Sequence, residues 1–185
     1  MNKVKLNGVY RARLVTLGYS HIPGVDYTEN FAPVINDITF RIICVMIAMY
    51  GWHAEIVDIE TAFLYGDLDE TIYMKMPQGY EIVNADKQID RTKQCMQLIK
   101  TVYGLTQAAR QFYKKLTSVL TTKLNMRKCM ADQCLLGRKT KKGIVLIGIY
   151  IDDTLCVGKQ EAIDELKMEL KQHFLPKRKG NLKNM

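Results

Sequence analysis

Hydrophobic and polar positions along this chain follow patterns that predict both helices and strands. Apolar side chains recur at helical spacing over 107–125 and 161–174, and they run almost all round the stretch between Asn36 and Gly51. Because Asn favours helix starts and Gly favours helix ends, we expect a buried helix between these two residues. Short apolar or alternating runs predict strands at 9–17, 53–59, 72–76, 95–98, 133–138, 144–150 and 154–157.

The order of these elements indicates the fold class. Helices and strands are interspersed without a regular βαβ rhythm, and residues 19–35 contain Pro23-Gly24 and Pro33, which are typical of an irregular loop. The TKKG turn at 140–143 joins two strands as a hairpin. We therefore expect a single domain with an α+β fold, in which helices pack on one face of a mainly antiparallel sheet.

Charge is distributed unevenly along the 185 residues, which carry a formal net charge of +8. Residues 26–90 contain twelve acidic and three basic side chains, whereas residues 114–142 contain nine basic side chains and one acidic side chain. An acidic centre between basic flanks allows a carboxylate cluster that binds divalent metal beside a surface that binds a polyanion.

Cysteine usage and the apolar runs argue against several classes of protein. Five scattered cysteines do not indicate a disulfide framework, and no second CxxC or histidine pair completes a zinc site with Cys129 and Cys134. The longest apolar run, 42–50, is far shorter than the roughly 20 residues that span a bilayer, and the N-terminal sequence lacks the apolar segment of a signal peptide. We expect a cytoplasmic protein that is neither secreted nor membrane-bound.

Three aspartates are the candidate catalytic residues. Asp152 and Asp153 interrupt a long apolar stretch, and Asp58 lies near the end of an expected strand. A hairpin turn alone explains the Asp152-Asp153 pair, but turn chemistry does not explain an acid at position 58. If the two strands are neighbours, the three carboxylates meet at one edge of the sheet and repel each other unless cations neutralise them. Two Mg²⁺ ions would do so, and that arrangement serves in-line phosphoryl displacement.

Four blocks of the sequence resemble the reverse transcriptase of copia-type LTR retrotransposons, in family order and with family spacing. The blocks are RARLVTLGYSHIPGVDYTENFAPV (11–34), DIETAFLYGDLDETIYMKMPQGY (58–80), YGLTQAARQFYKKL (103–116) and YIDD (150–153). The resemblance implies DNA synthesis from dNTPs on a primed RNA or DNA template, with Mg²⁺ as cofactor and Mn²⁺ as a substitute. It also implies a right-hand polymerase fold.

The same resemblance assigns the chain to parts of that fold. The fingers correspond to about 1–52 and 67–105, and the palm to about 53–66 and 106–175. We expect the thumb and the RNase H, integrase and protease domains of a retrotransposon polyprotein to be missing from this chain.

The resemblance also implies roles for individual residues. Asp58 and Asp152 match the two metal-binding aspartates, Asp153 is the third acid, and the backbone carbonyl of Ile59 is the expected further metal ligand. Phe63 matches an aromatic beneath the incoming sugar, where its ring selects deoxynucleotides by shape, although an ordinary core phenylalanine is the alternative.

Further residues match the nucleotide-binding segments of the family. Arg11 and Arg13 share one face of an expected strand and are candidates to clamp the triphosphate, with Arg13 favoured and solvated surface charges as the alternative. The other candidates are Tyr103, Gly104 and Gln107 beside the nucleotide, and Tyr150 and Ile151, which complete the YIDD motif.

One position departs from the family pattern, and a second function stays open. Ala109 stands where the family usually has proline, and we expect only a small effect on stability. The alternative to a polymerase is a catalytically inactive, nucleic-acid-binding remnant of a retroelement, which binds duplex without incorporating nucleotides.

Overall fold

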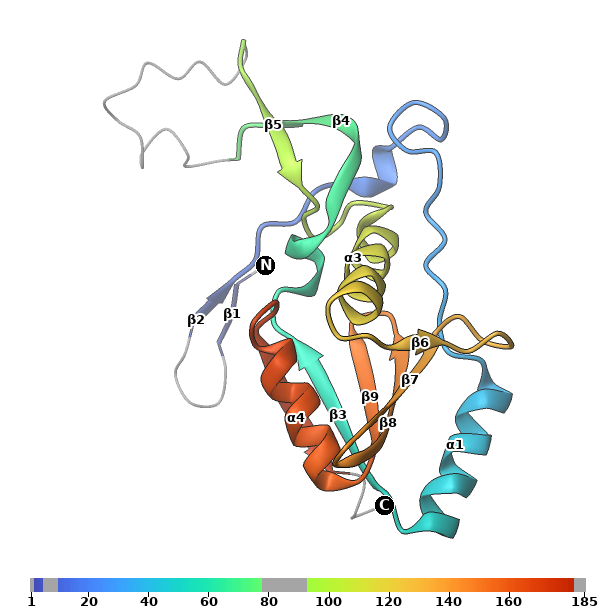
Figure 1. Cartoon of the computed structure of the whole chain (residues 1–185). Coiled ribbons are helices and arrows are strands. Elements are labelled where there is room, and N and C mark those ends of the chain that lie inside the picture. Colours follow the sequence, from blue (N-terminus) through green and yellow to red (C-terminus); the bar gives the residue numbers. More distant parts are fainter. Residues whose placement is uncertain (1, 5–9, 78–92, 182–185) are drawn as a thin grey trace.

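A computed structural model describes residues 2–4, 10–77 and 93–181 (Figure 1). In chain order the helices and strands are β1 (Asn2–Val4), β2 (Tyr10–Ala12), α1 (Asp37–Tyr50), β3 (His53–Ile59), β4 (Asp67–Lys75), β5 (Cys95–Lys100), α3 (Ala108–Thr122), β6 (Arg127–Lys128), β7 (Leu135–Thr140), β8 (Gly143–Tyr150), β9 (Asp153–Gly158), α4 (Gln160–Leu170) and β10 (Pro176–Asn181). Short 3₁₀ turns lie at Gly18–Ser20 and Ala62–Tyr65.

A six-stranded antiparallel sheet forms the centre of the molecule, with the strand order β10-β3-β9-β8-β7-β6. Two separate hairpins, β1–β2 and β4–β5, lie outside it. The expected α+β class with antiparallel sheets is confirmed. Neither β6 nor β10 was predicted from the sequence, because one has two residues and the other, PKRKGN, is strongly polar.

Helices α3 and α4 cover one face of this sheet. Phe112 and Leu116 of α3 and Leu166 of α4 are fully buried against Ile147 and Ile149 of β8. Ile147 and Ile149 alternate along β8 with residues whose side chains lie on the opposite face, as a pleated strand requires. This face contains the largest cluster of buried apolar residues in the described chain.

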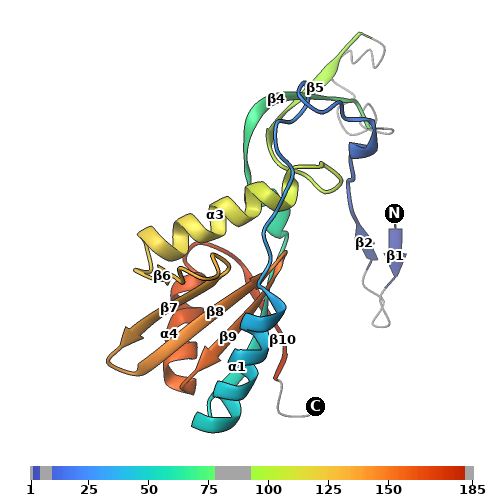
Figure 2. The same ribbon diagram turned by 90° about the vertical axis from the view of Figure 1, so that its right-hand side faces the viewer.

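Helix α1 packs on the other face, so the expectation that helices cover only one face is wrong (Figure 2). Ile43 is 1% exposed and packs near Val157 and Leu155 of β9. The predicted ends of this helix are confirmed: the Asn36 side chain accepts from the Ile38 N–H, and Gly51 is left-handed with φ 60°.

The prediction that α1 is buried is also wrong. Four apolar side chains on its outer surface are between 55% and 71% exposed, and they are Ile38, Ile42, Val45 and Met49. An apolar pattern indicates that a helix suits a nonpolar environment. It does not indicate whether the described chain supplies a second surface to cover that helix.

The remaining structure lies beyond one end of the sheet, next to the start of α3 (Figures 1 and 2). Here the expected strand 9–17 is reduced to β2 among the described residues, and residues from 13 to 36 are irregular, with a 3₁₀ turn at Gly18–Ser20 and a tight turn between Pro23 and Tyr27. Arg110 of α3 forms an ion pair with Glu29, and the backbone N–H of Thr28 donates to Glu70 at 3.2 Å. These contacts tie the irregular segment to α3 and β4.

Within the described part of the chain, no helix has the length and apolar character needed to cross a membrane.

Candidate active site

The sheet brings two of the three candidate aspartates together. Asp58 on β3 lies directly opposite Asp153 on β9 in the antiparallel register. Residues opposite each other across such a pair point to the same face, with Cβ atoms about 4.5–5.5 Å apart. Both side chains are half-buried. Alternation along β3 places them on the α1 face, because Val57 and Ile59 belong to the core beneath α3 and α4.

Asp152 lies in the turn that joins β8 to β9. Tyr150 and Asp153 are the paired residues that close this turn, so Ile151 and Asp152 form its tip. Ile151 has a φ of 56°, which is a rare conformation for a β-branched residue and is energetically unfavourable. All three aspartates therefore lie at one end of the sheet, as the sequence predicted for neighbouring strands.

The backbone of Ile59 is oriented toward the same region. The N–H of the next residue, Glu60, donates to the carbonyl of Leu175 at 2.7 Å, on the β10 side of β3. Successive residues of a strand direct their backbone groups to opposite sides. The carbonyl of Ile59 consequently points toward the β9 side, where Asp152 and Asp153 lie.

These groups fit a divalent cation in chemical type, because Mg²⁺ prefers carboxylate and carbonyl oxygens. In the described ranges, however, no set of three or more His, Cys, Asp or Glu side chains is grouped tightly enough to hold a metal ion. The structure thus supplies one aspartate pair across β3 and β9, with the third aspartate on the adjoining turn. The convergence of all three on a metal stays a prediction.

A second group of candidate residues lies beside β3 and consists of two rings in edge contact and a guanidinium over one of them; we call this group the ring stack. Phe63 lies in the 3₁₀ turn that follows β3, and its ring contacts Tyr103 edge-on with centroids 5.2 Å apart. The guanidinium of Arg13 lies 4.3 Å from the centre of the Tyr103 ring. A cation at this distance over an aromatic face is attracted by the ring quadrupole. Arg13, Tyr103 and Phe63 thus come together from three distant parts of the sequence.

Gly104 allows the Arg13 segment to approach so closely. It has a φ of +92°, and a Cβ built there would lie 2.1 Å from the carbonyl oxygen of Thr16. The Thr16 N–H donates to the carbonyl of Tyr103 at 2.8 Å. The backbone of Thr16 thus occupies the space that a side chain at position 104 would need, and the position of Gly104 beside a nucleotide stays a prediction.

Two other candidate residues lie elsewhere. Gln107 is fully buried, and its Nε2 donates to the carbonyl of Asp26 at 3.2 Å, so its side chain holds the irregular segment against α3. Arg11 lies in β2 opposite Lys3, and its side chain is outside the described residues. The nucleotide contacts of both residues stay predictions.

A small cavity next to the aspartates was missed by sequence reasoning. It has a volume of about 280 Å³ and lies between Tyr150 and the segment that enters α1, where Ile35 and Phe40 line it. The N–H of Ile35 donates to the carbonyl of Ile149 at 2.8 Å, which places this segment on the sheet. No pattern in the sequence predicts this contact, because it joins the segment before α1 to a strand more than 100 residues later.

Ion pairs fix the β4–β5 hairpin to α3 near this site. Asp69 accepts from Lys114 at 2.6 Å and from Gln111 at 2.8 Å. Hydrogen bonds from these two side chains, that from Lys114 first, hold the pKa of Asp69 below its usual value of 3.8. Asp67 likewise pairs with Lys100 and Lys115, whose hydrogen bonds lower its pKa.

Comparisons with known proteins identify the family of the chain. The sequence profile of the family described as "Reverse transcriptase (RNA-dependent DNA polymerase)" matches residues 1–185. The chain is 35% identical over 167 residues to a retrovirus-related Pol polyprotein from transposon TNT 1-94 of Nicotiana tabacum, a match that covers 89% of this chain and 12% of the polyprotein. It is 37% identical over 149 residues to the corresponding polyprotein from transposon RE1 of Arabidopsis thaliana, covering 80% of this chain and 10% of that protein.

No solved structure matches the chain. The expected resemblance to copia-type retrotransposon proteins is confirmed by the plant transposon relatives. The chain belongs to the reverse transcriptase (RNA-dependent DNA polymerase) family.

Proposed function

We propose that this chain carries the fingers and palm of an RNA-directed DNA polymerase and that Asp58, Asp152 and Asp153 bind two divalent cations. The register of Asp58 opposite Asp153, with Asp152 on the adjoining turn, is the observation that carries the proposal. Carboxylates at neighbouring positions repel each other, and divalent cations bound between them would offset that repulsion. Bound Mg²⁺ stabilises charge on the attacking and leaving oxygens during nucleotidyl transfer.

The protein residues would bind and orient the reactants. The aspartates would hold the cations at this end of the sheet, and the carbonyl of Ile59, which points toward the β9 side, would be a further ligand. Phe63 would pack beneath the sugar of the incoming nucleotide, held by its edge contacts with Tyr103 and with Phe112, whose centroid lies 6.5 Å away. A fixed ring excludes a 2′-hydroxyl by shape.

Arg13 is our candidate for the triphosphate contact. Its position over Tyr103 leaves the guanidinium on the exposed side of the ring stack, since Arg13 itself is exposed. Arginine suits this role because its planar fork binds phosphate oxygens in pairs. Gln107 would act indirectly, by fixing the start of α3 beside the stack.

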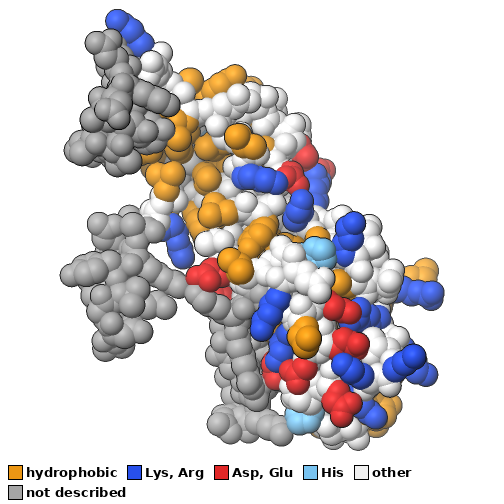
Figure 3. All heavy atoms as spheres, turned by 60° about the vertical axis from the view of Figure 1, so that its left-hand side comes forward, with side chains coloured by type: hydrophobic (Ala, Val, Ile, Leu, Met, Phe, Trp, Pro, Cys, Tyr) orange, Lys and Arg blue, Asp and Glu red, His pale blue; other side chains and the backbone are white. Residues whose placement is uncertain are grey.

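The fingers and palm are proposed as follows. The six-stranded sheet with α3 and α4 corresponds to the palm, and the β4–β5 hairpin with residues 13–35 corresponds to the fingers. In the view of Figure 3, hydrophobic side chains are most frequent over the part that carries β4 and β5, whereas mixed charges cover the part that carries α4. This chain spans 12% or less of the length of the two named relatives. Its proposed partners are therefore a template, a primer and the further domains of a polyprotein. Its proposed location is a cytoplasmic particle.

Metal binding and primer extension test this function together. Mg²⁺ or Mn²⁺ is expected to raise the melting temperature of the wild-type chain, and the increase should disappear in Asp58→Asn and Asp152→Asn. Asp164→Asn on α4, whose side chain is 52% exposed, is the matched control and should keep the increase.

Extension of oligo(dT) on poly(rA) with dTTP and Mg²⁺ is expected for the wild-type chain and for Asp164→Asn, and not for Asp152→Asn. Extension that survives Asp152→Asn would contradict the assignment. A chain that binds the duplex but shows neither a metal-dependent stabilisation nor extension would instead be the inactive remnant.

A further inference from the structure

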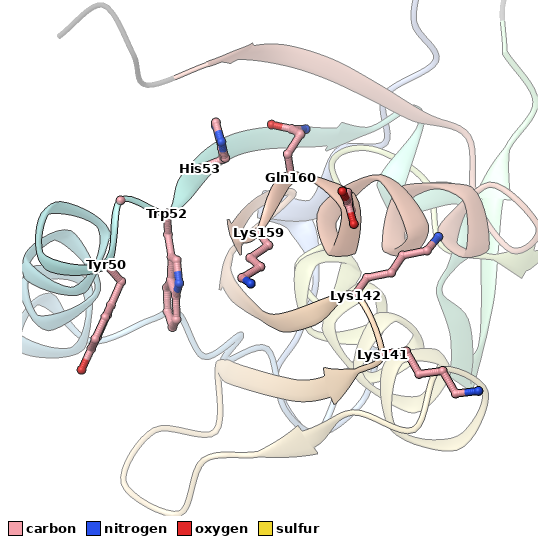
Figure 4. Close-up of a pocket in the computed structure, with 9 residues that line it drawn as sticks. Tyr50, Trp52, His53, Lys141, Lys142, Lys159 and Gln160 are labelled. Carbon is pink, nitrogen blue, oxygen red and sulfur yellow. The ribbon is translucent and has the colours of Figure 1, made fainter.

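A larger cavity lies at the end of the sheet opposite the aspartates (Figure 4). Its volume is about 450 Å³, and it forms where α1 ends and β3 begins, beside the β7–β8 turn and the start of α4. Strand β8 runs from Gly143 at that turn to Tyr150, and seven steps along it span about 24 Å at roughly 3.4 Å per residue. The cavity is therefore independent of the candidate active site.

Two aromatic rings form one side of the cavity. Tyr50 is the last residue of α1 and Trp52 precedes β3, and the left-handed Gly51 between them reverses the chain direction. Their ring centroids lie 5.2 Å apart with an interplanar angle of 31°. Tyr50 is 61% exposed, so a wide aromatic surface stays open to solvent.

Three lysines form the rest of this site. Lys141 and Lys142 come from the β7–β8 turn, and Lys159 precedes α4; all three are exposed (Figure 4). Lys142 has one distant ion-pair partner, Glu165 at 3.9 Å, while Lys141 and Lys159 form no ion pair with the side chains that the structure describes. Glu161 is the one acidic residue in the lining, so positive charge predominates.

A cavity that combines an open aromatic surface with lysines matches the chemistry of a nucleotide chain: Lys159 lies beside Trp52, and Lys141 and Lys142 extend away from the rings along the same surface (Figure 4). Flat bases stack on aromatic side chains, while lysines contact the phosphates on either side of the base. An acidic peptide would satisfy the lysines but would leave the paired rings without a flat partner. Duplex DNA or RNA would satisfy the lysines too, but its bases are already stacked on each other.

We propose that this aromatic–lysine pocket (Tyr50, Trp52, Lys141, Lys142 and Lys159) binds single-stranded nucleic acid. A base stacks against the ring pair, Lys159 contacts the phosphate beside it, and Lys141 and Lys142 contact phosphates further along the strand. The site requires neither the aspartates nor a metal ion, and it gives the chain a hold on an unpaired strand away from the candidate active site.

The single tryptophan of the chain makes this proposal directly measurable. Because Trp52 is the only tryptophan, the intrinsic tryptophan fluorescence reports on this pocket alone. Titration of the full chain with a ten-nucleotide oligo(dT), in EDTA and low salt, is expected to quench this fluorescence to saturation. An abasic oligomer of the same length should quench much less, because it offers phosphates without bases.

Two pairs of substitutions separate the pocket from general surface charge. Lys141→Gln with Lys142→Gln is expected to weaken oligo(dT) binding at least fivefold and to reduce the slope of log affinity against log salt by about 1.4, the value for two lost phosphate contacts. Lys123→Gln with Lys171→Gln removes the same charge from two exposed lysines outside the pocket and should leave the affinity within twofold. Tyr50→Leu should weaken binding without changing the salt slope.

Several outcomes would overturn the proposal. These are an absence of quenching, equal quenching by the abasic oligomer, equal loss of affinity in both lysine pairs, or displacement of oligo(dT) by poly-glutamate at equal charge concentration. The last result would identify an acidic protein as the partner. Asp152→Asn is expected to keep the quenching, so failure of the polymerase proposal and failure of this one give different results.

Discussion

Glu55 shows how a single charged residue is accommodated inside this molecule. It lies on β3 with 1% exposure and accepts from Lys167 at 2.8 Å and from Gln160 at 2.9 Å, both on α4. Burial alone would lower the pKa of Lys167, but hydrogen bonds to Asp164 and Glu55 outweigh it and raise the pKa above its usual 10.5. The pair thus joins α4 to the sheet by charge as well as by apolar packing.

Removal of one partner from this pair is expected to be costly. Lys167→Met should lower the free energy of unfolding by about 3 kcal/mol, because it removes the cation that compensates a buried carboxylate. Lys171→Met changes an exposed lysine one turn further along and should cost less than about 0.5 kcal/mol. Urea unfolding measures both values. Equal effects of the two substitutions would mean that Glu55 does not depend on Lys167.

The turn of the YIDD motif offers a second test at a single residue. Ile151 has a left-handed φ of 56°, which costs an L-residue about 1–2 kcal/mol, whereas asparagine tolerates this region. Ile151→Asn is therefore expected to raise the free energy of unfolding by about 1 kcal/mol. Ile144→Asn, at an exposed position within β8, should lower it because asparagine is a poor strand former. Denaturant unfolding of both variants decides the matter, and destabilisation by Ile151→Asn would show that the turn is not strained.

At the scale of elements, α1 is a helix that uses only part of its apolar surface. Ile43 is 1% exposed and contacts the sheet, while its neighbour Ile42 is 55% exposed. We expect Ile43→Ala to cost about 2–5 kcal/mol and Ile42→Ala less than about 1 kcal/mol, measured by urea unfolding. Similar costs at both positions would indicate that the outer surface of α1 is also covered.

This helix also shows what the sequence can predict and what it cannot. Its ends depend on local chemistry at Asn36 and Gly51, and the prediction of both was correct. Its burial depends on which surfaces fold against it, which no pattern within the helix contains. The same reason explains the strand predicted for 9–17: alternation favours an extended chain, but a strand also needs a partner, and among its described residues only Tyr10–Ala12 pair with another strand.

The segment that carries Arg13 depends on one glycine. Gly104 and Gly24 both have positive φ, of +92° and +80°, but only Gly104 has backbone atoms within reach of an added Cβ. Gly24→Ala should cost only the backbone strain of about 1 kcal/mol, whereas Gly104→Ala should cost more and displace residues 13–18. Trypsin cleavage after Arg13 is expected to accelerate in Gly104→Ala alone. Equal cleavage of both variants would mean that this packing does not fix Arg13.

At the scale of the whole molecule, the candidate site combines parts of differing predictability. The position of the three aspartates at one end of the sheet could be predicted because they lie at the ends of apolar runs, but the sequence did not predict that Asp153, and not Asp152, is the residue opposite Asp58. The contact of Arg13 with Tyr103 could not be predicted from pattern, since it joins residues 90 positions apart through an irregular segment. The aromatic–lysine pocket could not be predicted from pattern either, because α1, the β7–β8 turn and α4 meet only in the folded chain.

Acid stability of the whole fold depends on aspartates that join separate elements. Asp132 is 8% exposed and accepts from the N–H of Asn36, before α1, and from the N–H of Cys134, before β7, both at 2.9 Å. Burial alone would raise the pKa of Asp132, but these N–H groups and the Thr39 hydroxyl outweigh it and lower the pKa below 3.8. Asp69, whose pKa is also lowered, similarly joins β4 to α3.

A lowered pKa in the folded state means that these carboxylates stabilise the fold above their unfolded pKa and lose that contribution as the pH falls through the folded pKa. Lys167 acts in the opposite sense: its raised pKa gives stability that is complete below 10.5 and is lost as the pH rises through the folded value.

We therefore expect thermal unfolding temperatures that are nearly constant from about pH 5 to 9 and fall below about pH 4. Asp132→Asn should lower the free energy of unfolding at neutral pH by about 1–3 kcal/mol and make the fall in acid shallower, because it removes one of the titrating groups. Asp37→Asn, at a side chain 71% exposed, is the control and should change the free energy of unfolding by less than about 0.5 kcal/mol. An acid limb of the same steepness in Asp132→Asn and the wild type would show that Asp132 does not contribute to the pH dependence.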